Sequence, residues 1–333
     1  MAEQQPELAN TVTRAAHYLS SRLPRGRVFF LDGGSCPENV AAARAGGAIV
    51  LEQDKIFDAI DWERLLPILN LHGRPVGRSG QGLNIFAAHI ALHALGVRDD
   101  DLVFQGDADV QNYEELAPIE RLLSAWSLEK STRHAKLAQP GRNNEMTMVA
   151  LAMQQLFSCL DLPWVPPAVK QLGHDVFMAL APDKWLTCGL YLVTGEIILS
   201  RPFASGYLDA TVQAVWATGA PECGWRNIRY VECPVHCRDS VNTTTKETLI
   251  LSSVAMHLQG IVMHGLAPHE WNADHIMRLN RSMMPRLCDI PEIGDIAGPV
   301  TVHRIDPDRL IPSVSSLCEE RIIDLARVAE IVA

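Results

Sequence analysis

Two aspartates, Asp107 and Asp109, follow a short apolar run, Leu102–Phe104, in the stretch DLVFQGDADVQNYEEL. An apolar run of this length that stops at Gln-Gly predicts a buried strand ending there. Residues two apart in an extended or turning backbone point the same way, so both carboxylates can face one small volume. Carboxylate oxygens suit Mg²⁺ or Mn²⁺, which in turn bridges the phosphates of a nucleotide. The DxD pattern therefore indicates a metal-dependent nucleotide site.

A second interpretation of the same pair needs no ligand. Asp-x-Asp followed by Asn112 is also typical of a solvated turn that caps the next helix. An isolated DxD motif favours this simpler reading. What lies at the ends of the neighbouring strands decides between the two interpretations.

The first part of the chain alternates between helical and strand patterns. Residues 6–22 have apolar positions at helical spacing, and a strand is predicted over Val28–Leu31. A Gly-containing turn, a helix starting near Pro37, a Gly-Gly stop and a second strand, Ala48–Leu51, follow. This order predicts a β-α-β unit, and parallel sheets built from such units carry ligands at the carboxyl ends of their strands.

Further along, a Gly-rich loop at residues 73–83, GRPVGRSGQGL, opens a predicted helix over Asn84–Leu95. A second helix is predicted from about Glu114 to Ser127. The polar stretch 129–146 predicts no regular element, and residues 244–333 have a mostly helical pattern.

The composition limits the classes of function. With a formal net charge of −10 and a pI of about 5.6, the chain does not have the basic surface that broad nucleic-acid binding requires. We find no apolar run long enough to span a membrane and no leader peptide, so a cytoplasmic location is expected. The eight cysteines are irregularly spaced, which is not typical of a disulfide scaffold.

Five motifs follow one another in the order VFFLDGGSCPENVAAARAGGAIV, GRSGQGLNIFAAHIAL, DDLVFQGDADVQNYEEL, HAKLAQPGRNNEM and RPFASGYLDATVQAV. Their succession resembles that of GT-A glycosyltransferases, and most of all the family 2-like glucosyl-3-phosphoglycerate synthase type, over residues 6 to about 260. The resemblance implies an α/β fold with a Rossmann-like mixed sheet flanked by helices. We divide the chain into a GT-A domain at residues 1–240 and a mostly helical extension at residues 241–333 packed on it. The apolar, heptad-like stretches of this extension predict a packing surface or a homodimer surface.

The resemblance implies a donor site for a UDP-sugar. Its members are Asp32, Gly34 and Ser35 toward the uridine, Arg78, Ser79 and Gly80 toward the diphosphate, and Asp107 toward the ribose. Asp109 is expected to bind Mg²⁺ or Mn²⁺ as the cofactor. His236, about two positions from the family's metal-binding histidine, is expected to be a second ligand.

An acceptor site is implied as well. Arg142 and Asn144 would hold a carboxylate or phosphate, and Tyr207 would lie beside the sugar or the acceptor, so that Asp109, Arg142 and Tyr207 carry the catalysis. The implied activity is transfer of a hexose, glucose, from a UDP-sugar to a small acidic acceptor such as glycerate or 3-phosphoglycerate. A retaining mechanism is expected from the same resemblance.

Several positions depart from the family pattern. The family's Gly-Lys-Gly loop is Arg78-Ser79-Gly80 here, and its first strand, which ends in Asn-Glu, has no counterpart in MAEQQ at residues 1–5. The acidic residue after the family's paired glycines falls on Tyr191. These differences keep two alternatives open: a nucleotide-sugar-binding protein without catalysis, and a sugar nucleotidyltransferase, which shares the fold.

Overall fold

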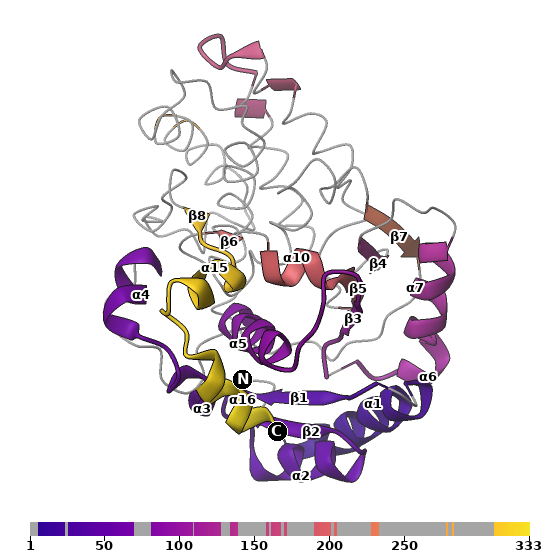
Figure 1. The fold of residues 1–333 in the computed structure, drawn as a ribbon. Coiled ribbons are helices and arrows are strands. Elements are labelled where there is room, and N and C mark those ends of the chain that lie inside the picture. Colours follow the sequence, from indigo (N-terminus) through magenta and orange to yellow (C-terminus); the bar gives the residue numbers. More distant parts are fainter. Residues whose placement is uncertain are drawn as a thin grey trace.

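Helices cover both sides of the strands in the computed structural model of the chain. Helix α2 (Pro37–Ala45) lies on one side of strands β1 (Phe29–Asp32) and β2 (Ile49–Glu52), and helix α5 (Gln81–Ala94) lies on the other (Figure 1). The structure describes residues 6–23, 26–69, 81–108, 110–127, 134–138, 158–159, 161–167, 170–171, 190–200, 203–204, 228–232, 278, 282 and 310–333.

The predicted β-α-β unit is confirmed. After the 3₁₀ turn η2 (Pro6–Leu8) and helix α1 (Ala9–Arg22), strand β1 (Phe29–Asp32) leads through α2 (Pro37–Ala45) into β2 (Ile49–Glu52). β1 and β2 pair in parallel. α2 starts with a proline, whose missing N–H is no loss in the first turn of a helix.

Small residues let α1 and α2 approach closely. A Cβ on Gly46, at the end of α2, would come within 2.6 Å of the Cβ of Ala16 on α1. Gly47 follows with φ of 92°, which glycine adopts without strain. The Gly-Gly stop in the sequence thus ends α2 and also sets its contact with α1.

Three helices come next: α3 (Gln53–Phe57), α4 (Trp62–Leu69) and α5 (Gln81–Ala94). The helix predicted after the Gly-rich loop is confirmed as α5. It lies deep in the fold, because Phe86 and Ile90 on it have no exposed surface.

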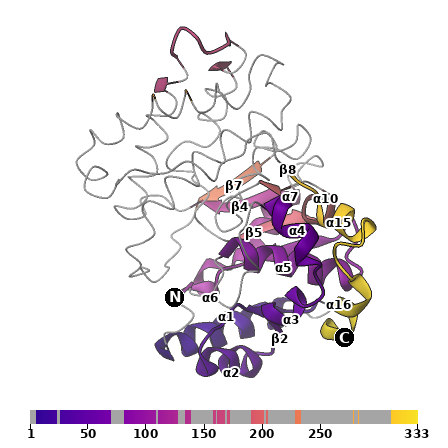
Figure 2. The same ribbon diagram turned by 90° about the vertical axis from the view of Figure 1, so that its left-hand side faces the viewer.

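A mixed four-stranded sheet forms from distant parts of the chain. Its strands β3 (Leu102–Gln105), β4 (His134–Ala138), β5 (Tyr191–Thr194) and β7 (Ile228–Glu232) lie in the order β3-β5-β4-β7. β5 is antiparallel to β3 and β4, whereas β4 and β7 are parallel. Figure 2 shows β5, β4 and β7 stacked away from β2 and the N-terminal helices.

Two predictions made from local pattern were wrong. The polar stretch 129–146, expected to hold no element, contains β4, which forms because β5 and β7 pair with it on both sides. The single helix expected from about Glu114 is two helices, α6 (Tyr113–Leu116) and α7 (Pro118–Ser127). Ala117 between them is left-handed, with φ of 42°, which ends α6, and Pro118 begins α7, where its missing N–H is no loss.

The remaining described elements are α10 (Gly195–Ser200), β6 (Phe203–Ala204), β8 (Leu310–Ile311), α15 (Val314–Glu319) and α16 (Leu325–Val332). β6 and β8 form a short antiparallel pair.

The C-terminal segment returns to the N-terminal part of the chain. The backbone N–H of Asp324 donates to the carbonyl of Ala59, and that of Asp61 donates to the carbonyl of Ile322, both at 2.8 Å. Buried residues of α15 and α16 belong to the same core cluster as α5. The described end of the 241–333 region is therefore part of the core; the domain division at 240 and the dimer surface stay predictions.

The β1–β2 pair and the four-stranded sheet pack against the same two helices, α1 and α5, but no hydrogen bonds between described strands join them. On one face, Leu31 of β1 and Val103 of β3 pack into the same cluster around α5. On the other face, α1 lies across both sheets, beside Phe30 of β1 and Phe104 of β3. Within the described residues no strand joins β1 to β3.

The burial of each strand depends on how many neighbouring strands it has. All four residues of β5, which has a neighbour on each side, are buried. All four residues of β1 are only half-buried, and Leu102 of β3 is 43% exposed. A strand with one partner leaves one edge and part of its side chains uncovered.

Candidate functional site

The turn after β1 is built around the carboxylate of Asp32. Its Oδ1 accepts hydrogen bonds from the backbone N–H groups of Gly34, at 2.9 Å, and Ser35, at 2.6 Å. Gly34 has φ of 104°, a conformation that glycine adopts and other residues rarely do. The Gly-containing turn predicted from the sequence is present, and Asp32 holds its shape in the manner of an Asx turn.

A buried hydroxyl lies in the same turn. The Oγ atom of Ser35 is buried and has no hydrogen-bond partner among the described residues. Leaving a buried hydroxyl unpaired costs about 1–3 kcal/mol. Ser35 is therefore a candidate for contact with a bound ligand.

The turn touches the start of α5. A Cβ placed on Gly33 would come within 2.5 Å of the side-chain Oδ1 of Asn84, so the two segments are in direct contact. Asn84 lies in the first turn of α5, immediately after the Gly-rich loop. The first turn of a helix presents unpaired N–H groups and the positive end of its dipole, which favour an anion. The structure thus brings two of the predicted motifs together.

The first aspartate of the DxD pair is held through its backbone. The hydroxyl of Tyr113, in α6, donates to the carbonyl oxygen of Asp107 at 3.0 Å. Gly106 leaves room for this contact, because a Cβ there would come within 2.2 Å of the Tyr113 oxygen. The Asp107 side chain is half-buried. Gly106 and Tyr113 therefore hold the backbone of Asp107 in place.

Asp32 and Asp107 each stand at the carboxyl end of a strand. β1 begins shortly after α1 ends, so it runs back along α1 toward the first turn of that helix. Ala108, just beyond β3, packs in the same cluster as Ala9 in that first turn. Carboxyl ends of strands are where ligands bind in open α/β sheets, and Asp32 ends β1 while Asp107 follows the end of β3.

Tyr191 is a site neighbour that the sequence marked only as a departure from the family. It is 1% exposed, and the register of β3 with β5 places it opposite Gln105. Burial and then the nearby carboxylate of Asp107 raise the pKa of Tyr191 well above its usual range, while a hydrogen bond with the Gln105 side chain acts the other way. The phenol is therefore neutral at physiological pH.

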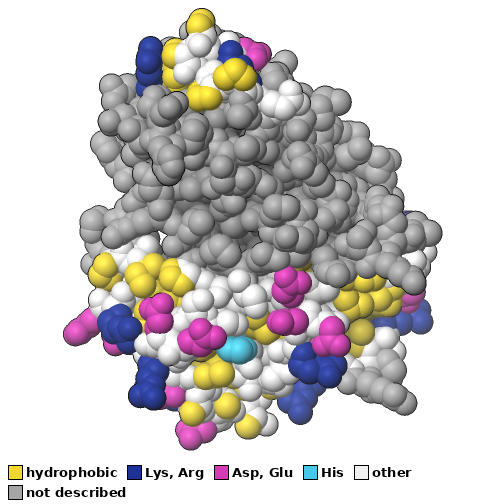
Figure 3. All heavy atoms as spheres, turned by 45° about the horizontal axis from the view of Figure 1, so that its top comes forward, with side chains coloured by type: hydrophobic (Ala, Val, Ile, Leu, Met, Phe, Trp, Pro, Cys, Tyr) yellow, Lys and Arg dark blue, Asp and Glu magenta, His cyan; other side chains and the backbone are white. Residues whose placement is uncertain are grey.

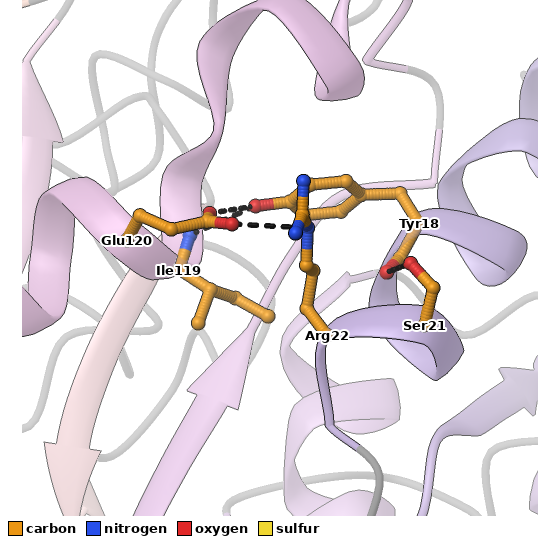
Figure 4. A network of polar contacts seen from close by, with 5 residues as sticks. All are labelled: Tyr18, Ser21, Arg22, Ile119 and Glu120. Atoms are coloured by element: carbon orange, nitrogen blue, oxygen red, sulfur yellow. Dashed lines mark hydrogen bonds and ion pairs between the residues drawn. The ribbon is translucent and has the colours of Figure 1, made fainter.

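A polar network holds α1 against α7 (Figure 4). The hydroxyl of Tyr18 donates to Glu120 and accepts from the backbone N–H of Ile119. Arg22 forms an ion pair with the same carboxylate at 3.0 Å. Burial, with the hydrogen bond to Glu120, raises the pKa of Tyr18. The sequence reasoning missed this network, because it joins two helices that no local pattern relates.

Of the predicted site residues, Asp32, Gly34, Ser35 and Asp107 lie in the described part of the chain. The others lie outside the described residues: Arg78, Ser79, Gly80, Asp109, Arg142, Asn144, Tyr207 and His236. The described residues contain no cluster of three or more metal-binding side chains. Of the DxD pair only Asp107, expected toward the ribose, is described; the expected metal ligands, Asp109 and His236, lie outside the described residues.

Figure 3 shows basic and acidic side chains interspersed over the described part of the face that it draws. No helix in the described ranges combines the length and the apolar character needed to cross a bilayer.

No protein-family model and no curated protein matches the sequence. Solved structures do match. Glucosyl-3-phosphoglycerate synthase from Mycobacterium tuberculosis is 18% identical with a TM-score of 0.51, over 77% of this chain and 77% of that one. Mannosyl-3-phosphoglycerate synthase from Rubrobacter xylanophilus is 16% identical with a TM-score of 0.51, over 78% and 72%.

This chain has the GT-A fold. The fold class expected from the order of the motifs is thus confirmed. A further GT-A structure, the Mycobacterium tuberculosis glucosyl-3-phosphoglycerate synthase with Mn²⁺, UDP and glucosyl-3-phosphoglycerate, is 19% identical with a TM-score of 0.50, over 75% of this chain and 76% of that one. At these identities the likeness concerns the GT-A fold.

Proposed function

We propose that this protein is a metal-dependent hexosyltransferase that moves glucose from a UDP-sugar to a small acidic acceptor such as glycerate or 3-phosphoglycerate. The observation that carries the proposal is the contact between Gly33 and Asn84, which joins the turn after β1 to the first turn of α5. The GT-A fold, and a GT-A structure that holds Mn²⁺, UDP and a glucosylated phosphoglycerate, support it.

The described residues suit the nucleotide half of the donor. The buried hydroxyl of Ser35 would bond to the uridine, beside the backbone that Asp32 shapes. The first turn of α5 would face the diphosphate, with Arg78 from the preceding loop supplying a guanidinium for the phosphate oxygens. Asp107, just beyond the end of β3, would accept hydrogen bonds from the ribose hydroxyls.

The cofactor and the acceptor would be held by residues outside the described part. Asp109, with His236, would bind Mg²⁺ or Mn²⁺, which when bound supplies positive charge for the departing UDP. Arg142 and Asn144 would hold the acid group of the acceptor, since a guanidinium forks onto a carboxylate or phosphate. Tyr207 would lie beside the sugar. We assign retention of configuration on the family resemblance.

Calorimetry of UDP binding with and without Mn²⁺ tests the donor site. Asp109→Ala is expected to abolish the metal-dependent part of binding while the far-UV spectrum stays unchanged. Asp100→Ala is the matched control, because that side chain is 78% exposed and only weakly paired with Arg98. Unchanged affinity of Asp109→Ala in the presence of Mn²⁺ would refute the metal assignment.

A transfer assay separates the enzyme from the alternatives. Incubation with UDP-glucose and Mn²⁺ over a panel of glycerate, 3-phosphoglycerate and related acids is expected to release UDP. Arg142→Ala is expected to raise the acceptor concentration needed and to leave UDP binding nearly unchanged. Tight UDP binding without transfer to any acceptor would favour a binding protein, and pyrophosphate release from UTP and a sugar phosphate would favour a nucleotidyltransferase.

A further inference from the structure

The hydroxyl of Tyr113 reaches the DxD segment just beyond the end of a strand. The pairing of β3 with β5 ends at Gln105, and Asp107 lies two residues further along the chain. There the Tyr113 hydroxyl donates to the backbone carbonyl of Asp107 at 3.0 Å. A side chain of α6 therefore holds the backbone past the last residue pair of the two strands.

The position of the phenol is set by the core and not by the loop. Tyr113 is 2% exposed and belongs to the cluster formed by residues of α1, α6 and α7. Its ring centroid lies 5.9 Å from that of Tyr18 on α1, and Leu116 of the same short helix is buried. Because close packing leaves a buried ring little freedom, the hydroxyl is a fixed donor and the loop backbone conforms to it.

Gly106 lets the loop come this close to the ring. A Cβ on Gly106 would lie 2.2 Å from the Tyr113 oxygen and 3.0 Å from side-chain atoms of Phe104 and Leu190. A side chain at this position would push the phenol and the loop apart. The glycine is therefore part of the same contact, although it has no side chain that could bind a ligand.

The residues that follow Asp107 are also anchored in the core. Ala108 packs against the cluster that α1 and α2 share, and Val110 is 2% exposed in the same cluster as Tyr113. In the sequence, Asp109 stands between these two residues. Contacts at positions 107, 108 and 110 thus hold the described part of the DxD segment.

We propose that Tyr113 is a positioning residue for the donor site, which holds the backbone of Asp107 so that its carboxylate meets the ribose hydroxyls of the nucleotide. The inference rests on the proposed function, in which Asp107 contacts the ribose. A carboxylate on a fixed backbone loses little conformational freedom on binding, so more of its hydrogen-bond energy appears as affinity. Tyr113 acts through Asp107 and needs no contact of its own with the ligand.

Binding of UDP and of its dideoxyribose analogue in the presence of Mn²⁺ tests this role, because the analogue lacks the hydroxyls that would donate to Asp107. The wild type is expected to bind UDP about tenfold more tightly than the analogue. Tyr113→Phe, which removes the hydroxyl and keeps the packed ring, is expected to weaken UDP about threefold to tenfold and the analogue much less. An equal loss of affinity for both nucleotides would show that Tyr113 only stabilises the fold.

Tyr18→Phe is the matched control. Its ring lies beside that of Tyr113 in the same cluster, but its hydroxyl bonds to α7, at Glu120 and Ile119. This variant is expected to be less stable than the wild type and to keep the ratio of the two affinities. A ratio that falls equally in both variants would assign the effect to a looser core and would contradict the inference.

The carbon-13 chemical shift of the Asp107 backbone carbonyl gives a readout that needs no ligand. It is expected to move upfield in Tyr113→Phe, because the carbonyl loses a hydrogen-bond donor, and to stay in place in Tyr18→Phe. If the wild type does not bind UDP, the proposed function fails, and this shift still decides whether Tyr113 holds the loop. An unmoved shift would overturn the inference even where UDP binds.

Gly106→Ala tests the same contact from the loop side. The added methyl group displaces the phenol oxygen, so UDP is expected to lose affinity relative to the analogue here too. Combining it with Tyr113→Phe removes the oxygen atom with which the methyl group collides. The double variant is therefore expected to lose less discrimination than the product of the two single losses. Losses that multiply would show that the two residues act separately and would contradict the inference.

Discussion

Gly33 and Asn84 are in direct contact, close enough that a Cβ on Gly33 would lie 2.5 Å from the Asn84 amide. Gly33 belongs to the turn after β1 and Asn84 to the first turn of α5. This contact joins the two motifs assigned to the uridine and the diphosphate. Gly33 has no side chain that could bind the ligand. Replacing it therefore tests the contact between the two motifs and leaves every ligand-binding side chain in place.

Gly33→Ala is expected to lower the free energy of unfolding by about 1–3 kcal/mol, since the added methyl group must push Asn84 and the start of α5 away. The affinity for UDP is expected to fall as well. Gly96→Ala is the control: Gly96 has φ of 78° and no neighbour within 4 Å of an added Cβ. It is expected to lose stability through backbone strain alone and to keep its UDP affinity; equal affinity in both variants would contradict the assigned site.

Tyr18→Phe is expected to lower the free energy of unfolding by about 1–3 kcal/mol, because it removes the hydrogen bond to Glu120 and leaves the buried backbone N–H of Ile119 without its acceptor. Arg22→Ala removes the ion pair to the same carboxylate. This pair is half-exposed, so its loss is expected to cost at most about 0.5 kcal/mol. Urea unfolding measures both changes, and an equal effect would mean that charge, not burial, holds α1 to α7.

His89 is expected to make the protein less stable in acid. It is 1% exposed on α5, and burial lowers its pKa to about 3. The unfolded chain binds a proton at His89 below pH about 6.5, whereas the folded chain does so only near 3. The stability present above pH about 6.5 is therefore lost as the pH falls toward 3, by up to about 1.4 kcal/mol for each pH unit.

Urea unfolding at about pH 7 and about pH 5 checks this dependence, and His89→Leu is expected to remove much of it. His93→Leu is the matched control on the same helix. Burial also lowers the pKa of His93, but the charge of Glu319 opposes that shift. His93→Leu is therefore expected to change the pH dependence of the free energy of unfolding less than His89→Leu does. An unchanged slope in His89→Leu would assign the acid sensitivity to other groups.

Hydrogen exchange is expected to distinguish β5 from β1 and β3. Amides of β5 have a neighbouring strand on each side, whereas every second amide of β1 and β3 points away from its one partner in the described sheets. Those outward amides are expected to exchange faster than the amides of β5. Uniformly slow exchange in all three strands would show that a further strand pairs between β1 and β3.

Local pattern predicted most elements near their observed bounds. The strand expected at Val28–Leu31 is β1, Phe29–Asp32, and the helix expected at Asn84–Leu95 is α5, Gln81–Ala94. These elements carry their own signals: apolar periodicity, a proline at the start and glycines at the end. β4 was missed because a five-residue strand carries little periodic signal, and its partners lie far along the chain.

The sequence by itself determined the kinds of chemistry available: a glycine turn shaped by Asp32, a helix opening after a Gly-rich loop, and carboxylates where an apolar strand ends. These follow from side-chain type and near-neighbour spacing, which the backbone expresses locally. Only the tertiary structure decided that Gly33 meets Asn84 and that Tyr191 pairs with Gln105 across two strands. Such contacts depend on strand pairing and helix packing between distant segments, and burial, which sets the protonation of Tyr191, exists only once those segments have come together.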